Sequence, residues 1–389
     1  MPQFQRFDPS LCDFPRPAVP LLPTFRWSDL RLAAEPATRR VLDQRTGARR
    51  FARGRYALHA AYRAAGVGPR GTLLAPAYHC RTMLDPALAL SAPVLLYPVS
   101  RTLAPAIEDI RALVARSTPA VRVLLVPHYF GWEQSPALMA QLDVVCREND
   151  IVLIEDCSHA WQIAAKRVAT GAAQRVLVAS PYKFFASEEG GILWSSPARA
   201  GAQGTSAGLR DELKGLRSMW TGRRAGAGAL PRLTGRPPAA QIARGADLTE
   251  TSDAPSGMYA RGTEGRDACA VACWVMRRTA VGGVVERRRA NYRRWLAAVA
   301  ALSGARALYP VMPADCAPYM FPLYLERPDP DFFLLKKMGL PIFRWDEMAV
   351  SECAVAADYR LRLLHLPCHQ TLSEQQMQWM ISVLGEVLR

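Results

Sequence analysis

The sequence lacks several features that would assign it to a special class of protein. No apolar run reaches the roughly 18–20 residues that a membrane-spanning helix needs, and the N-terminus lacks the basic-then-apolar order of a signal peptide. Nine cysteines are scattered, and only Cys269 and Cys273 stand close together, at a spacing unlike that of a zinc knuckle. We therefore expect a cytoplasmic protein with reduced thiols, no membrane contact and no metal site.

Lysine is also scarce, since it supplies only five of the 49 basic residues in the chain. The formal net charge of +15 would suit a nucleic-acid-binding protein. However, the arginines are spread along the chain among alanine and glycine, and the sequence has no zinc-finger, RNA-recognition or basic-region pattern. We expect no nucleic-acid partner, although the charge suits an anionic small-molecule substrate.

At 389 residues the chain is long enough for two domains with a large core. Between about residues 50 and 195, short apolar runs alternate with helical patterns, which predicts a mostly parallel sheet covered on both faces. In such sheets, ligands bind beyond the carboxyl ends of the strands. The predicted strands are 72–76, 94–99, 121–127, 151–155 and 175–180, and the predicted helices are 55–66, 105–116 and 135–149.

The remainder of the chain differs in composition. Residues 196–256 are rich in Gly, Ala, Arg, Ser and Pro, which predicts a long loop or inter-domain connection with one helix near 207–217. One or two helices are expected within 264–303, and the last helix opens with a capping pattern of Ser373 and Gln376. The predicted parts are an N-terminal extension (1–45), a large domain (46–255, with the basic loop 196–255) and a smaller C-terminal α+β domain (256–389).

Lys183 lies in the stretch SPYKFF, with aromatic residues on both sides. Partial desolvation makes a lysine a nucleophilic amine. In a chain that otherwise uses arginine, a lysine in apolar surroundings indicates that a primary amine is needed, because only a primary amine forms a Schiff base. The alternative is a lysine whose ammonium group reaches solvent along an apolar surface.

The stretch IEDCSHAWQ (154–162) places two acids and a histidine at the end of a predicted buried strand. There, Asp156 can keep a pyridinium nitrogen protonated, which is what a protein supplies to pyridoxal phosphate together with a Schiff-base lysine. His159 is a candidate contact to the phenolic oxygen or ring face of that cofactor. The alternatives are a turn or N-cap acid for Asp156 and a packed core histidine for His159.

The phosphate and ring of such a cofactor need further contacts. Gly54 stands just before a predicted helix whose free N–H groups can bind an anion, and Arg55 follows it. Ser180 can add a hydroxyl group to the same site. Tyr78 and His79 come directly after the predicted strand 72–76 and are candidates to stack on the ring. An ordinary helix-start glycine and a buried core tyrosine are the alternatives.

With these motifs the sequence resembles the DegT/DnrJ/StrS family of pyridoxal-phosphate aminotransferases, best known for amino-sugar synthesis. The resemblance spans roughly residues 45–389, and its most specific stretches are IEDCSHA, SPYKFFASEEGG, VPHYFGW and LLHLPCHQTLSEQQMQWMISVL. It implies fold type I of the pyridoxal-phosphate-dependent transferases, the aspartate-aminotransferase type, with 46–255 as the cofactor-binding domain. It also implies a homodimer with active sites at the subunit interface, for which the helix 55–66 and the apolar N-terminal segment are candidate surfaces.

The resemblance also implies a role for each site residue. Asp156 would pair with the pyridine nitrogen, His159 would lie near the phenolic oxygen, and Lys183 would carry the Schiff base. Where the family has a ring-stacking aromatic residue this chain has Cys80, so Tyr78 or His79 would have to take that place. The full set of implied cofactor contacts is Gly54, Arg55, Tyr56, Tyr78, His79, Asp156, His159, Ser180 and Lys183.

The implied activity is transfer of an amino group from an amino-acid donor, such as glutamate, to a keto acceptor, with a nucleotide-linked sugar as a candidate. Two alternatives stay open. One is another pyridoxal-phosphate reaction such as dehydration, although the sugar dehydratases of the family replace the lysine that is present here. The other is a non-catalytic pathway or regulatory protein that keeps the fold.

Overall fold

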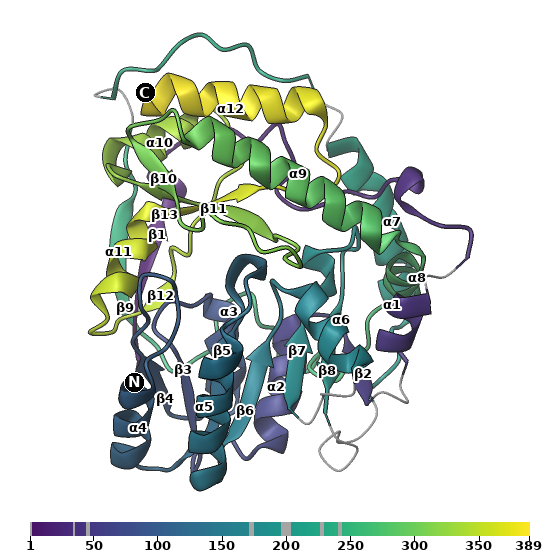
Figure 1. Cartoon of the computed structure of the whole chain (residues 1–389), viewed down its shortest axis with the longest axis vertical. Helices are drawn as coiled ribbons and strands as arrows, with labels where there is room; N and C mark the ends of the chain where they lie inside the picture. Colours follow the sequence, from purple (N-terminus) through teal and green to yellow (C-terminus); the bar gives the residue numbers. More distant parts are fainter. Residues whose placement is uncertain are drawn as a thin grey trace.

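The structure is a computed structural model, and it describes residues 2–33, 36–43, 47–170, 175–195, 204–225, 229–239 and 243–389 (Figure 1). Its helices are α1 (Pro36–Val41), α2 (Gly54–Ala64), α3 (Arg81–Ala89), α4 (Ile107–Arg116), α5 (Pro136–Glu148), α6 (Trp161–Ala169), α7 (Leu209–Ala225), α8 (Ala270–Arg278), α9 (Val281–Val299), α10 (Pro328–Lys337), α11 (Ala354–Arg362) and α12 (Glu374–Leu388). Its strands are β1 (Gln3–Asp8), β2 (Ala48–Phe51), β3 (Thr72–Pro76), β4 (Val94–Tyr97), β5 (Val121–Pro127), β6 (Val152–Asp156), β7 (Val176–Ala179), β8 (Gly191–Trp194), β9 (Ala246–Thr251), β10 (Ala305–Ala307), β11 (Met320–Leu325), β12 (Met348–Ala349) and β13 (Leu363–Pro367). Within the described residues, no helix combines the length and apolar character that crossing a membrane requires.

A seven-stranded sheet in the order β2-β8-β7-β6-β5-β3-β4 forms the centre of the large domain. The strands from β4 to β7 run parallel to their neighbours, whereas β8 runs antiparallel to both β7 and β2. The expected α/β class with a mostly parallel sheet is therefore confirmed. The apolar runs that predicted these strands lie in the sheet because both of its faces are covered, and β3, β7 and β8 are buried along their whole length.

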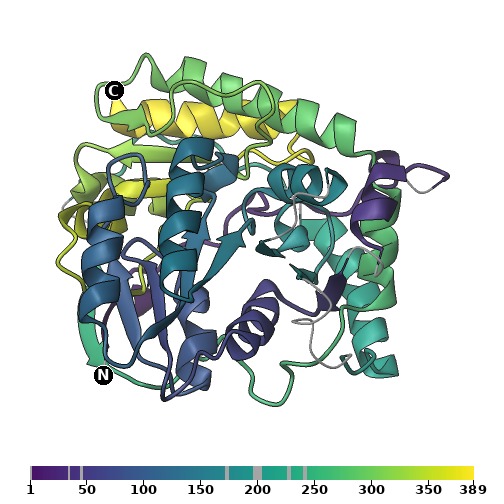
Figure 2. The same ribbon diagram turned by 60° about the horizontal axis from the view of Figure 1, so that its bottom comes forward.

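The C-terminal part adds a three-stranded antiparallel sheet, β10-β11-β13, with its own apolar core. The helices α9 and α12 lie side by side over this sheet in both views (Figures 1 and 2). The expected capping box of α12 is confirmed, since Ser373 accepts from the Gln376 N–H and the Gln376 side chain accepts from the Ser373 N–H.

A third small sheet joins segments that are far apart in the sequence. Strand β1 lies between β12 and β9 and pairs antiparallel with both. The first residues of the predicted N-terminal extension are thus part of a sheet. The predicted loop 196–255 contains β9 and also α7, which packs on α8; its segments 196–203, 226–228 and 240–242 lie outside the described residues.

Candidate active site

The carboxyl ends of the parallel strands bring the two sequence motifs together at one edge of the sheet. Asp156, the last residue of β6, pairs with Pro127 of β5 and with Val178 of β7. Ser180 follows β7 directly, and the short 3-10 turn Pro181–Lys183 comes next. Because parallel strands end on the same side, the acid of the first motif and the lysine of the second belong to one region.

Asp156 is a buried carboxylate with little internal compensation. Its side chain is 2% exposed, and its Oδ1 accepts a hydrogen bond from the Ser158 N–H at 2.8 Å. Among the described residues, no arginine, lysine or histidine forms an ion pair with it. A buried anion without a cationic partner is unfavourable, and a pyridinium N–H beside it would supply the missing charge.

The neighbouring acid Glu155, in contrast to Asp156, is surrounded by basic side chains. Its buried carboxylate contacts His128 (2.9 Å), Arg167 (3.2 Å) and Arg175 (2.9 Å). Although burial acts in the other direction, the His128 hydrogen bond and these charges lower the pKa of Glu155 to about 2. Of the two acids in the motif, Glu155 is therefore fixed by structural ion pairs, and Asp156 is the one that a ligand can use.

Lys183 is half-buried, and its Nζ lies 5.4 Å from the centre of the Tyr319 ring. The same Tyr319 ring also contacts His159, whose ring stacks on it with centroids 4.3 Å apart. Burial, and then the charges of Lys183 and His365, hold the pKa of His159 well below its usual value. His159 is therefore neutral near pH 7.

The hydrogen bonding of His159 also sets its tautomer. The Phe130 N–H donates to Nδ1 of His159 at 3.3 Å, so the single proton of the neutral ring belongs on Nε2. An Nε2–H group is a hydrogen-bond donor. This is the form of histidine that can contact a phenolate oxygen.

Two glycines allow the first turn of α2 to approach Ser180, which follows β7, closely. A Cβ on Gly54, the first residue of α2, would lie 1.9 Å from Ser180 Oγ, which in turn donates to Ser158 Oγ at 3.0 Å. A Cβ on Gly191 would lie 2.2 Å from the Arg53 carbonyl oxygen. At Gly191 the backbone leaves no room for a Cβ, and at Gly54 a Cβ would displace the Ser180 hydroxyl. Since no side chain caps α2, its first turn and two serine hydroxyls form a cradle suited to a phosphate.

The side chains of the next two predicted contacts point elsewhere. The Arg55 guanidinium donates to the Met258 carbonyl oxygen, and the Tyr56 hydroxyl lies 3.3 Å from the Ala260 nitrogen. Both side chains thus bind the segment that precedes α8. Only their backbone belongs to the α2 turn.

Tyr78 and His79 behave differently from each other. Tyr78 is fully buried, lies 4.6 Å from the Trp345 ring and contacts Nε2 of His365 at 3.1 Å. In His79, Nδ1 contacts the carbonyl oxygens of Pro76 and Ala77, while Nε2 accepts from the Ala349 N–H at 3.1 Å. Both nitrogens of His79 are therefore used to join β3 to β12, and no donor or acceptor is left for a ligand.

Arg288 on α9 is a site residue that the sequence did not reveal. It is fully buried and makes five hydrogen bonds of 2.9–3.2 Å. Its partners are Gln370 Oε1 and the carbonyl oxygens of Pro318, Tyr319, Lys183 and Phe184. One guanidinium thus fixes the backbone of both Lys183 and Tyr319. The run of three arginines at 287–289 gives no signal of which one is buried.

His365 on β13 is a second residue of this kind. Burial, with a contribution from the Lys183 charge, lowers its pKa to about 3. Its Nδ1 is buried and has no hydrogen-bond partner among the described residues. His365 therefore lies within reach of the Lys183 charge and keeps one buried ring nitrogen unpaired among the described residues.

Comparison with known proteins places this chain among others of similar sequence and fold. Residues 48–200 match the model of the DegT/DnrJ/EryC1/StrS aminotransferase family. No curated protein matches the chain in sequence.

Solved structures with the same fold cover nearly the whole chain. The sugar aminotransferase CalS13 from Micromonospora echinospora is 16% identical, with 94% of this chain and 99% of that chain covered and a TM-score of 0.59. DesV from S. venezuelae, solved with a ketimine intermediate, is 17% identical, with 92% and 90% covered and a TM-score of 0.58. NtdA from Bacillus subtilis, solved with bound PMP, is 13% identical, with 91% and 78% covered and a TM-score of 0.59.

Asp156 and the Gly54 cradle suit the two charged ends of pyridoxal 5'-phosphate, the cofactor of this family. At these identities the solved structures establish the fold, and the family model adds the sequence pattern of the large domain. Together, these findings show that residues 48–200 are similar to the pyridoxal-phosphate-dependent DegT/DnrJ/EryC1/StrS aminotransferases and that the chain has their type I fold.

Proposed function

We propose that this chain is an aminotransferase that holds pyridoxal 5'-phosphate between Asp156 and the α2 turn and uses Lys183 as its reactive amine. The observation that carries the proposal is the meeting of three groups at one sheet edge. These are a buried carboxylate without a cation, a neutral histidine with a free donor, and the half-buried lysine.

The bound cofactor would act as an electron sink for a carbanion on the substrate. Asp156 would hold the ring nitrogen in its protonated form, and His159 would donate its Nε2–H to the phenolic oxygen. The first turn of α2, with the hydroxyls of Ser158 and Ser180, would bind the phosphate. Tyr78 is retained as an aromatic neighbour of the site, whereas the hydrogen bonds of His79 argue against a role in binding.

Lys183 would have two tasks. Its Nζ would hold the cofactor covalently until an amino-group donor takes its place. The freed amine would then move a proton at the reacting carbon of the substrate, as a general acid and base. Arg288 would act as a positioning residue, because it binds the carbonyl oxygens of Lys183 and Phe184 and so limits where the amine can be.

The substrates would be an amino-acid donor and a keto acceptor, with a nucleotide-linked sugar as the first acceptor class to test. The names of the similar structures, among them a sugar aminotransferase, support this choice. A screen that follows each half-reaction through the visible absorption of the cofactor would identify both substrates. A spectrum that no amino acid changes would contradict the aminotransferase proposal.

The covalent site can be tested by borohydride reduction followed by peptide mapping. We expect a pyridoxyl label on Lys183 in the parent chain and none there in Lys183→Arg. Lys166→Arg is the matched control, since Lys166 is exposed and paired with Asp315 on the surface. A label on another lysine, or bound cofactor without any label, would overturn the assignment.

We also propose a homodimer, although the structure changes the surface on which it would rest. The helix α2 is almost entirely buried within its own chain. In contrast, α7 exposes Leu209, Leu213, Leu216 and Trp220, which follow one another at helical spacing along one face. Sedimentation should give twice the chain mass of 42.9 kDa, and Leu213→Glu should shift the protein towards the monomer. A parent chain that sediments as a monomer would exclude the dimer.

A cytoplasmic location is the remaining proposal. All nine cysteines are free thiols, and eight of them are buried, which suits a reducing compartment. Fractionation of cells that express the full chain would test this. Recovery of the protein outside the cytosol would contradict it.

A further inference from the structure

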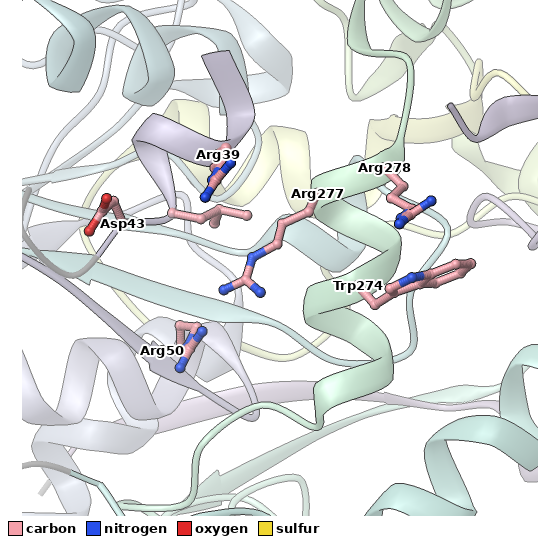
Figure 3. Close-up of a pocket in the computed structure, with 7 residues that line it drawn as sticks. Arg39, Asp43, Arg50, Trp274, Arg277 and Arg278 are labelled. Atoms are coloured by element: carbon pink, nitrogen blue, oxygen red, sulfur yellow. The ribbon is translucent and has the colours of Figure 1, made fainter. Parts of the chain in front are cut away.

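A cavity of about 590 Å³ lies between α1, β2 and α8 (Figure 3). Its lining residues are Arg39, Leu42, Asp43, Arg50, Trp274, Arg277 and Arg278. None of the residues proposed to hold pyridoxal phosphate is among them. The volume lies within the range of small-molecule sites in proteins.

Three arginines from three different elements converge on this cavity. Arg277 extends from α8 towards the space between Arg39 on α1 and Arg50 on β2 (Figure 3). In the part of the chain that the structure describes, none of the three forms an ion pair or a side-chain hydrogen bond. Other arginines of this protein do, such as Arg167 and Arg175, which bind Glu155.

The remaining charged residues of the cavity do not neutralise these three. Arg278 donates to the Leu32 carbonyl oxygen and lies 5.6 Å from the centre of the Trp274 ring, on the other side of α8 in Figure 3. Asp43 is the one lining carboxylate, and it has an interaction of its own. Asp267 acts on Arg50 only through its charge, without an ion pair.

An apolar core joins the segments behind the cavity. Leu42, at the end of α1, and Met276 of α8 belong to the same apolar core cluster as Ala48 of β2. The segments that carry the three arginines are therefore held together by packing, although the like charges of the arginines repel one another. Guanidinium groups match phosphate oxygens with paired hydrogen bonds, so an anion with several phosphate oxygens would remove the repulsion and satisfy their donors.

We propose that this cavity binds a small polyphosphate, such as the diphosphate group of a phosphorylated metabolite, through Arg39, Arg50 and Arg277. The three cations favour a ligand with several negative charges, and a diphosphate offers more charge and more phosphate oxygens to three guanidinium groups than a single phosphate does. The proposal is independent of the catalytic function proposed above.

Calorimetric titration with inorganic pyrophosphate tests the site. The chain is first saturated with pyridoxal phosphate, so that the α2 cradle is occupied, and the visible absorption is recorded throughout. We expect saturable binding that weakens as ionic strength rises. Arg50→Gln and Arg277→Gln should each lower the affinity by roughly tenfold, the usual effect of losing one charged hydrogen bond.

Arg293→Gln is the matched control, because Arg293 is an exposed arginine on α9 and does not line the cavity. It should bind pyrophosphate as the parent does, and circular dichroism should show all variants folded. The proposal is overturned by parent protein that does not bind, by parent-like affinity in Arg277→Gln, or by an equal loss in Arg293→Gln. It is also overturned if pyrophosphate displaces pyridoxal phosphate, since that would place binding at α2.

Discussion

Replacing Arg288 with lysine should damage the proposed active site more than its mild chemistry suggests. The guanidinium makes five hydrogen bonds, whereas a lysine ammonium has three donors on a single nitrogen. At least two acceptors therefore lose their hydrogen bond to the charged group. At roughly 1.5–3 kcal/mol for each such hydrogen bond, the free energy of unfolding should fall by about 3–6 kcal/mol.

An effect on catalysis is expected because part of this hydrogen-bond network holds the turn that carries Lys183. Two of the five acceptors are the carbonyl oxygens of Lys183 and Phe184, so the turn that carries the reactive amine becomes less constrained. We expect kcat to fall by roughly tenfold to a hundredfold because the amine is less well aligned, while KM for the amino donor changes little. Chemical denaturation measures the first effect, and single-turnover half-reactions at a temperature where the variant is folded measure the second.

Arg289→Lys provides the control. Arg289 is the next residue on α9 and donates to the carbonyl oxygens of Pro313 and Cys316, away from Lys183. It should lose some stability and keep its half-reaction rate. If Arg288→Lys keeps the parent rate per folded molecule, the positioning role is wrong, and Arg288 is only a structural residue.

Further predictions concern single groups. Asp156→Asn should still fold and bind pyridoxal phosphate but should lose at least about a hundredfold in turnover; near-normal transamination would remove Asp156 from the site. Gly54→Ala should weaken cofactor binding because its Cβ would meet Ser180 Oγ. The control Gly282→Ala, where nothing lies within 4 Å, should be neutral in the same equilibrium dialysis. Burial lowers the pKa of His79 to about 4, so the unfolded chain binds its proton first as the pH falls below about 6.5. Stability from His79 is thus present above that pH and should drop by about 2 kcal/mol by pH 5; equal denaturation midpoints at pH 7 and pH 5 would contradict this.

The sequence predicted the parallel strands well because each is a short apolar run that is buried on both faces. Helices α3 and α6 escaped prediction for local reasons. The first contains Pro86, which disfavours a helix, and the second begins inside the acid motif at Trp161. The antiparallel direction of β8 is set by its partners and cannot be read from four residues.

The sequence offered candidates where chemistry and spacing coincide, as with Asp156 and Lys183, which the fold brings to the same edge of the sheet. The sequence did not identify residues whose position depends on contacts between distant parts of the chain. Arg288 contacts Lys183 across 105 positions of the chain, and its neighbours Arg287 and Arg289 have the same side chain but different partners. For His79, the sequence showed a histidine at a strand end, but only the fold reveals that β12 takes its second nitrogen.

The position of β1 has a consequence for the order of folding. Its two neighbours in the sheet, Ala246–Thr251 and Met348–Ala349, lie far along the chain. A nascent chain therefore has no strand for residues 3–8 to pair with until most of the protein has been made. Pairs so distant in sequence form slowly, because a long loop must close first. This sheet should close only after β9 and β12 have been made, so that the earliest residues to be synthesised are among the last to reach their native place.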